Sequence, residues 1–92
     1  MMDVILDGIY QNITEEYRQA TAKFGPFNSA HEGYAVILEE MDELKAEVWK
    51  NQEKRDMDKM RAEVIQVATM AVRFIVDVCY PQAKGPALKP AP

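Results

Sequence analysis

The sequence predicts an all-α fold: a small helical bundle of three main helices that is completed by oligomerisation. Apolar residues recur every three or four positions in three long segments, which is typical of amphipathic helices. No stretch of useful length alternates apolar and polar residues, so no strand is predicted. With 92 residues, 48% hydrophobic and 28% charged, the chain has the size and composition of one folded domain.

The first predicted helix spans residues 3–23. Apolar side chains lie on or near one stripe along it: Ile5, Ile9, Ile13, Tyr17 and Phe24. Gly25 and Pro26 predict its end, because glycine supplies the left-handed cap and proline cannot continue a helix.

The second predicted helix begins at residues 29–32 and runs to about Asn51. Ser29 and Glu32 have the spacing of a capping box, in which the serine caps the helix and the glutamate reaches back to the serine N–H. The apolar seam alternates steps of four and three, as in helical bundles: Ala30, Tyr34, Ile37, Met41, Leu44 and Val48.

A polar connection, residues 51–56, leads to the third predicted helix, which Asp56 is expected to cap. This helix spans residues 57–79, and its seam shows the same alternation: Met57, Met60, Val64, Val67, Ala71, Phe74 and Val78. The last twelve positions hold four of the five prolines and no periodicity. We therefore predict a helical domain over residues 1–80 and a proline-rich tail over residues 81–92.

Neighbouring apolar residues widen both seams, for example Val36 and Leu38 on the second helix and Ile65 and Ile75 on the third. One thin three-helix protomer does not cover so much apolar surface. We therefore expect a homo-oligomer, either a dimer or a tetramer.

The net charge and the composition limit the classes of binding partner and the cellular compartment that can be expected. The net charge is −4 and there is no basic run, which argues against a nucleic-acid polymer but allows a single nucleotide held through a divalent cation. No stretch approaches the roughly 20 apolar residues of a membrane span. The first ten residues lack a basic region typical of a secretory signal, and there is one cysteine. A cytoplasmic protein is therefore expected.

Carboxylates flank the two seams. Glu40, Glu43 and Glu47 form a row on the second helix, and a second row on the third helix contains Glu63, Gln66, Met70, Arg73 and Asp77. If these helices pack antiparallel, both rows line one groove, where carboxylate oxygens suit Mg²⁺. The alternative is a solvated charged face, which is common on amphipathic helices.

The segment Glu39-Glu40-Met41-Asp42-Glu43, followed by nineteen residues and then Glu63-Val64-Ile65-Gln66, resembles the EExxE…ExxD signature of the MazG-like all-α nucleoside triphosphate pyrophosphatases. The resemblance covers about residues 24–78. It implies hydrolysis of a nucleoside triphosphate to a nucleoside monophosphate and pyrophosphate, by attack of water between the α- and β-phosphates.

The resemblance also implies roles for particular residues. Glu40, Glu43 and Glu63 are the expected catalytic carboxylates and ligands of Mg²⁺, or of Mn²⁺, and Glu39 is expected to position a ligand, a cation or water. The chain departs from the signature at Gln66, which offers a carbonyl oxygen as a ligand but removes one negative charge. This departure keeps an alternative open: a non-catalytic helical oligomer that acts as a nucleotide-binding regulator or a protein-interaction module.

Three further residues are candidates for binding the substrate. Arg73 is expected either to meet a phosphate or to pair with Asp77 one turn along the helix. Lys50 lies beyond the acidic cluster, where phosphate or solvent are equal alternatives. Trp49 either stacks on a nucleobase or is buried at a contact between protomers.

Overall fold

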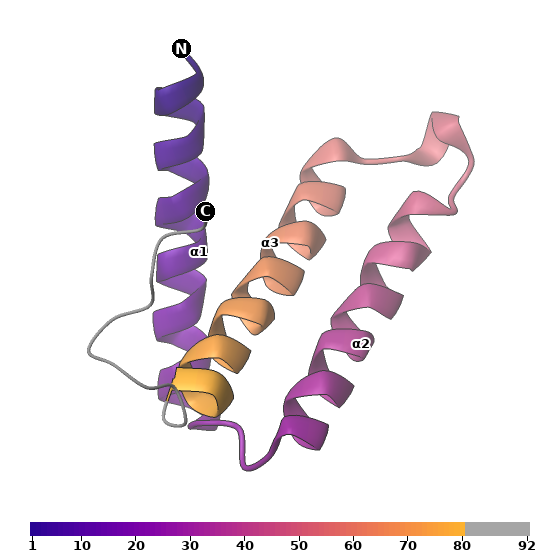
Figure 1. Cartoon of the computed structure of the whole chain (residues 1–92). Coiled ribbons are helices and arrows are strands. Elements are labelled where there is room, and N and C mark those ends of the chain that lie inside the picture. The colour runs from indigo at the N-terminus through magenta and orange to yellow at the C-terminus, as the bar shows by residue number, and fades with distance from the viewer. Residues whose placement is uncertain (81–92) are drawn as a thin grey trace.

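Within residues 1–80, which the computed structural model describes, the chain is helical apart from short connections (Figure 1). No strand occurs in this range, so the predicted all-α class with three main helices is confirmed. The predicted tail lies outside the described residues. The elements are α1 (Met2–Phe24), α2 (Ala30–Val48), a 3-10 helix (Gln52–Lys54), α3 (Met57–Phe74) and a π-helical segment (Ile75–Cys79).

The connection between α1 and α2 is built by local sequence. Gly25 ends α1 with φ 71° and ψ −175°, a conformation that essentially only glycine adopts without strain. The Ser29 hydroxyl caps α2 by accepting the Glu32 N–H at 3.0 Å. The second half of the predicted capping box is wrong, because the Glu32 carboxylate accepts from the backbone and side-chain N–H groups of Asn28 instead of the Ser29 N–H.

The predicted cap of α3 is confirmed: the Asp56 carboxylate accepts the N–H groups of Asp58 and Lys59, at 2.9 and 3.2 Å. Two helix ends differ from expectation. Helix α2 stops at Val48 rather than near Asn51. The α-helical part of α3 stops at Phe74, and the last turn is π-helical, with backbone hydrogen bonds that span one residue more.

Helix α3 lies between α1 and α2 and packs against both (Figure 1). The most buried residues gather where the α1–α2 connection meets the second half of α3. Phe27, in that connection, is 7% exposed, and Met70 and Arg73 of α3 are 5% and 3% exposed. The interior of the chain is therefore a small core at one end of the helices.

The predicted seams are only half correct. On α2, Ile37, Leu44 and Val48 are partly buried, whereas Tyr34 is 61% and Met41 45% exposed. A seam with steps of three and four has two edges on the helix, because the helix turns about 100° per residue. Only one edge of the α2 seam contacts α3, so the side chains of the other edge remain exposed to solvent.

On α3 the same division holds. Met60, Val67 and Phe74 are partly buried, and Val64 and Met57 are exposed. The row that the sequence placed beside the seam, which includes Met70 and Arg73, is instead the most buried part of the helix. Among the described helices, none is both long enough and apolar enough to cross a membrane.

Candidate metal centre

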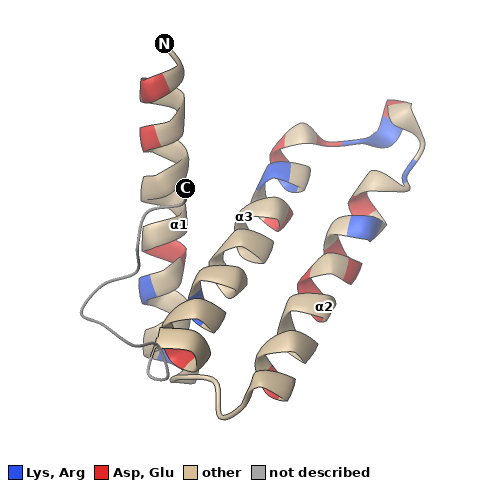
Figure 2. Cartoon of the chain, in the orientation of Figure 1, with Lys and Arg blue, Asp and Glu red and all other residues tan. Residues whose placement is uncertain are grey.

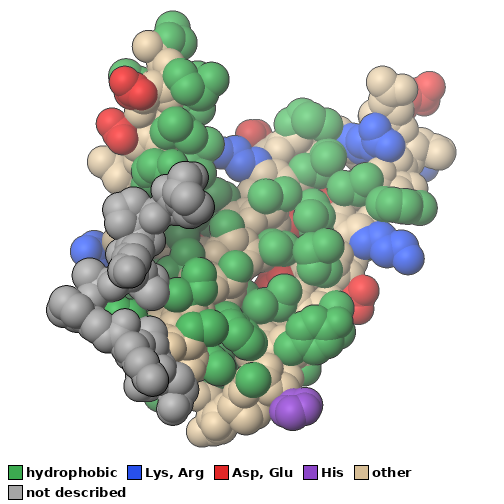
Figure 3. Space-filling model, viewed as in Figure 1, with side chains coloured by type: hydrophobic (Ala, Val, Ile, Leu, Met, Phe, Trp, Pro, Cys, Tyr) green, Lys and Arg blue, Asp and Glu red, His purple; other side chains and the backbone are tan. Residues whose placement is uncertain are grey.

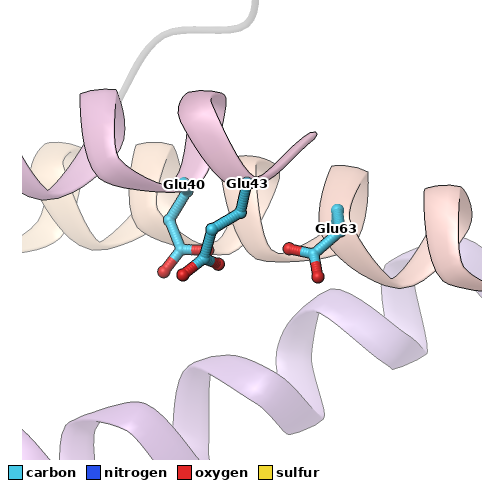
Figure 4. A group of neighbouring side chains, drawn as sticks. All are labelled: Glu40, Glu43 and Glu63. Carbon is cyan, nitrogen blue, oxygen red and sulfur yellow. The ribbon is translucent and has the colours of Figure 1, made fainter. Parts of the chain in front are cut away.

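Three carboxylates converge between α2 and α3. Glu40 and Glu43 project from α2, Glu63 projects from α3, and one oxygen of each lies within 4.8 Å of the others. Figure 4 shows the three side chains directed into the same space, on the side of the α2–α3 pair where α1 passes. Figure 2 shows further acidic residues along α2.

The local sequence explains this convergence. A spacing of three residues puts Glu40 and Glu43 on one side of α2. The short connection of residues 49–56 makes α2 and α3 antiparallel, and Arg55 secures it by donating from Nε to the Val48 carbonyl at 3.0 Å. Near the other end of the pair, Gly33 is buried against Phe74, which a side chain at position 33 would crowd. The two helices can therefore approach closely along their length.

The electrostatics of the cluster favour the binding of protons or a cation. Partial burial, followed by the negative charge of Glu43, raises the pKa of Glu40 to about 7. Partial burial and Glu43 also raise the pKa of Glu63. One buried oxygen of Glu40, Oε2, has no hydrogen-bond partner. A buried oxygen without a donor is uncommon.

The donor set fits a hard divalent cation. Mg²⁺ binds oxygen ligands at about 2.1 Å, so two ligand oxygens on one ion are at most about 4.2 Å apart. Three ligands of an octahedral ion include pairs at right angles, whose oxygens are only about 3.0 Å apart. Oxygens that lie within 4.8 Å of one another therefore have to move closer to share one ion, which flexible glutamate side chains allow. Three carboxylates would leave part of an octahedral shell open for water or for phosphate oxygens.

Gln66 is engaged elsewhere. Its amide nitrogen donates to a carboxylate oxygen of Glu16, on α1, at 2.7 Å. This bond links α1 to α3 and uses the amide nitrogen of Gln66 as a donor. The amide carbonyl oxygen is the atom that Gln66 can offer to a cation.

Arg73 is buried in the core rather than paired with Asp77. Its guanidinium donates to the Gly25 carbonyl and to the Met70 sulfur, and it lies 4.3 Å from the centre of the Phe27 ring. The Asp77 carboxylate accepts the Phe27 N–H at 3.0 Å. The Arg73 Nε atom is buried and without a partner.

Arg73 also lines a pocket of about 410 Å³ that reaches the cluster. Glu39 and Glu40 form part of its wall, with apolar surface from both aromatic residues near the α1–α2 connection. The full lining is Phe24, Gly25, Pro26, Phe27, Glu32, Val36, Glu39, Glu40, Met70 and Arg73. Glu39 and Arg73 therefore share a cavity with one carboxylate of the cluster.

The structure does not bring the other two candidates to this pocket. Lys50, beyond the end of α2, forms an ion pair with Glu47 at 2.8 Å. Trp49 is 74% exposed, and it lines a separate, mostly apolar groove with Met41 and Val48. The Lys45 ammonium lies 5.7 Å from the centre of the Trp49 ring.

The sequence analysis did not identify Glu16, Phe27 and Gly33 as residues that help to position the site. Glycine in a helix interior costs about 1 kcal/mol relative to alanine, so Gly33 was itself a signal of close helix packing. Phe27, an apolar residue between two helix-terminating signals, was a signal of a buried connection. Glu16 had no signal, because its partner is fifty residues away. Comparisons with protein-family models, curated proteins and solved structures gave no match.

Proposed function

We propose that this protein is a Mg²⁺-dependent nucleoside triphosphate pyrophosphohydrolase, a homo-oligomer that converts nucleoside triphosphates to monophosphates and pyrophosphate. The observation that carries the proposal is the convergence of Glu40, Glu43 and Glu63 from two helices to within 4.8 Å. These are the same three glutamates that the sequence resemblance to MazG-like pyrophosphatases implies as metal ligands.

The chemistry of the donor set supports this function. A divalent cation bound to three carboxylates would offset the charge of a triphosphate and polarise its phosphate oxygens. A water oxygen attacks phosphorus, the α–β bridging P–O bond breaks, and pyrophosphate leaves. The proton from water goes to a carboxylate.

The adjoining pocket supports the binding of a compact organic ligand. Its volume of about 410 Å³ falls in the range of small-molecule sites. It combines aromatic walls from Phe24 and Phe27 with the acidic side chains of Glu32 and Glu39. Carboxylates accept hydrogen bonds, so this wall favours a ring that carries N–H donors, as amino-bearing nucleobases do.

The test is pyrophosphate release from a panel of ribo- and deoxyribonucleoside triphosphates with Mg²⁺ or Mn²⁺. We expect release by the wild-type protein, loss of it in Glu43→Gln, and no effect of Glu53→Gln. The Glu53 control removes the same charge from an exposed position in the α2–α3 connection. If no triphosphate yields pyrophosphate with either metal, the proposal is wrong.

One observation favours a second candidate, a non-catalytic nucleotide-binding or assembly protein. Gln66 replaces the last carboxylate of the signature, and its hydrogen bond to Glu16 already satisfies part of its amide. A site with one charge fewer binds Mg²⁺ more weakly. Saturable binding of a triphosphate without pyrophosphate release would identify this candidate.

A further inference from the structure

A carboxylate of α1, that of Glu16, is hydrogen-bonded to the α3 residue at which the chain departs from the ExxD signature. The Gln66 amide nitrogen donates to Glu16 Oε2 at 2.7 Å, between residues that are fifty positions apart in sequence. Both side chains are partly buried. A hydrogen bond to an ionised carboxylate is short and stronger than one between neutral groups, so this contact holds the Gln66 side chain in place.

The bond with Glu16 also decides which end of the Gln66 amide faces α1. An amide has a nitrogen that donates and an oxygen that accepts, whereas an ionised carboxylate only accepts. The Glu16 carboxylate therefore selects the orientation in which the amide nitrogen faces it. The carbonyl oxygen, which is the only end of the amide that can bind a cation, is left for another partner.

Gln66 lies on the same side of α3 as the carboxylate cluster. It follows Glu63 by three residues, which is about one turn of helix, so the two side chains project from the same side. Figure 4 shows the cluster directed to the side of the α2–α3 pair where α1 passes. Hydrophobic side chains predominate on the face of α2 and α3 seen in Figure 3, which offers few oxygen ligands. A further side-chain ligand is therefore expected from the side of α1.

We propose that Glu16 is a positioning residue of the metal site, which holds the Gln66 amide with its carbonyl oxygen available to the divalent cation. The proposal rests on the metal site of the proposed function and does not require hydrolysis. A carboxylate that accepts the N–H of a metal ligand also polarises that ligand, which makes its oxygen a stronger donor to the metal. Glu16 thereby offsets part of the negative charge that the chain lacks at Gln66.

A purely structural link between α1 and α3 does not require a charge at position 16. A partly buried carboxylate costs more to remove from water than an amide does, and an amide at this position can bond to either end of the Gln66 amide. Glu16→Gln therefore separates the two roles. It preserves side-chain size and a bond between the helices, but it no longer selects the orientation of Gln66.

Mn²⁺ binding to the full chain tests the proposal without a measurement of activity. Titrations followed by the electron paramagnetic resonance signal of free Mn²⁺ give the Kd. Glu16→Gln should raise the Kd by about 10–100-fold, as loss of a partner of a metal ligand typically does. Glu15→Gln is the matched control, because Glu15 carries the same charge on the preceding, exposed residue of α1. Its Kd should stay close to that of the wild type, and both variants should have similar Tm values in EDTA.

A reversed pair, Glu16→Gln combined with Gln66→Glu, covers the case in which Glu16→Gln alone unfolds. This double variant keeps the net charge and allows a bond between the helices, now donated by the amide at position 16. It places the negative charge on the metal ligand itself, which strengthens the binding of a hard cation. The reversed pair should therefore bind Mn²⁺ more tightly than the wild type.

The proposal is overturned if Glu16→Gln leaves the Kd unchanged, if Glu15→Gln raises the Kd equally, or if the reversed pair binds no more tightly than the wild type. Mn²⁺ binding that is lost in Glu43→Gln but unchanged in Glu16→Gln refutes only the role of Glu16 and leaves the metal site in place. A wild-type protein that does not bind Mn²⁺ refutes the metal site and the proposed function as well.

Discussion

Removing one carboxylate from the cluster should stabilise the metal-free protein at pH 8. The Glu43→Gln substitution keeps the size and polarity of the side chain and removes the charge that helps to raise the pKa of Glu40. It also relieves repulsion with Glu63, whose pKa Glu43 raises as well. The effect therefore has the opposite sign from most substitutions, which destabilise.

The magnitude follows from the geometry. Two unit charges at 4.8 Å, the upper limit of the separations in the cluster, repel by about 0.9 kcal/mol in water and about 3.5 kcal/mol at an effective dielectric constant of 20. Glu43 is exposed, so solvent screening places the value near the lower figure. A gain of about 1 kcal/mol corresponds to a Tm increase of about 4–8 °C for a domain of this size.

Mg²⁺ should make the wild-type protein more stable than Glu43→Gln, which reverses the order expected without metal. At a Mg²⁺ concentration ten times its Kd, a site present only in the folded state adds about 1.4 kcal/mol to wild-type stability. Glu43→Gln, with one ligand charge fewer, should gain much less. Circular dichroism melts at pH 8, with EDTA or with Mg²⁺, measure both effects.

Glu53→Gln is the charge-matched control and should change neither the metal-free Tm nor the response to Mg²⁺. The reasoning is refuted if Glu43→Gln is no more stable than wild type in EDTA, or if both proteins respond equally to Mg²⁺.

Two further predictions follow from the same structure. The raised pKa of Glu40 means that the folded state binds more protons than the unfolded state between about pH 4.5 and pH 7. The contribution of Glu40 to metal-free stability is therefore greatest below this window and is lost as pH rises through it. A Tm that increases between pH 5 and pH 8 in EDTA contradicts this. Gly33→Ala puts a Cβ atom 2.6 Å from the Phe74 side chain and should cost about 1–3 kcal/mol. Gly8→Ala meets nothing within 4 Å and should instead gain up to about 1 kcal/mol in urea unfolding; equal effects at the two glycines would show that the close approach at Gly33 is unimportant.

Local physics made much of the fold predictable. Helix periodicity, the cap at Asp56 and the glycine end of α1 depend on residues that are neighbours in sequence, so they can be predicted from the sequence alone. The pairing of Glu40 and Glu43 with Glu63 also follows from spacing once α2 and α3 are taken as antiparallel.

What could not be predicted depends on contacts between distant residues. The rotation of α2 and α3, which turns Tyr34 outward and Arg73 inward, is set by where α1 and the α1–α2 connection pack. The bond between Gln66 and Glu16 likewise requires the position of α1, and the change to a π-helical turn at Ile75 has no explanation in the local sequence.

The two connections of this protein differ in how they tolerate added residues. The stretch between α1 and α2 is anchored at two points, to Arg73 of α3 through Gly25 and to Asp77 of the following π-helical segment through Phe27. The stretch of residues 49–56 is exposed throughout, and Arg55 secures it locally. Inserted peptides or affinity tags therefore belong between α2 and α3, since loop length there adds little to the entropy of closure. The same insertion beside Phe27 would disturb both of these anchors.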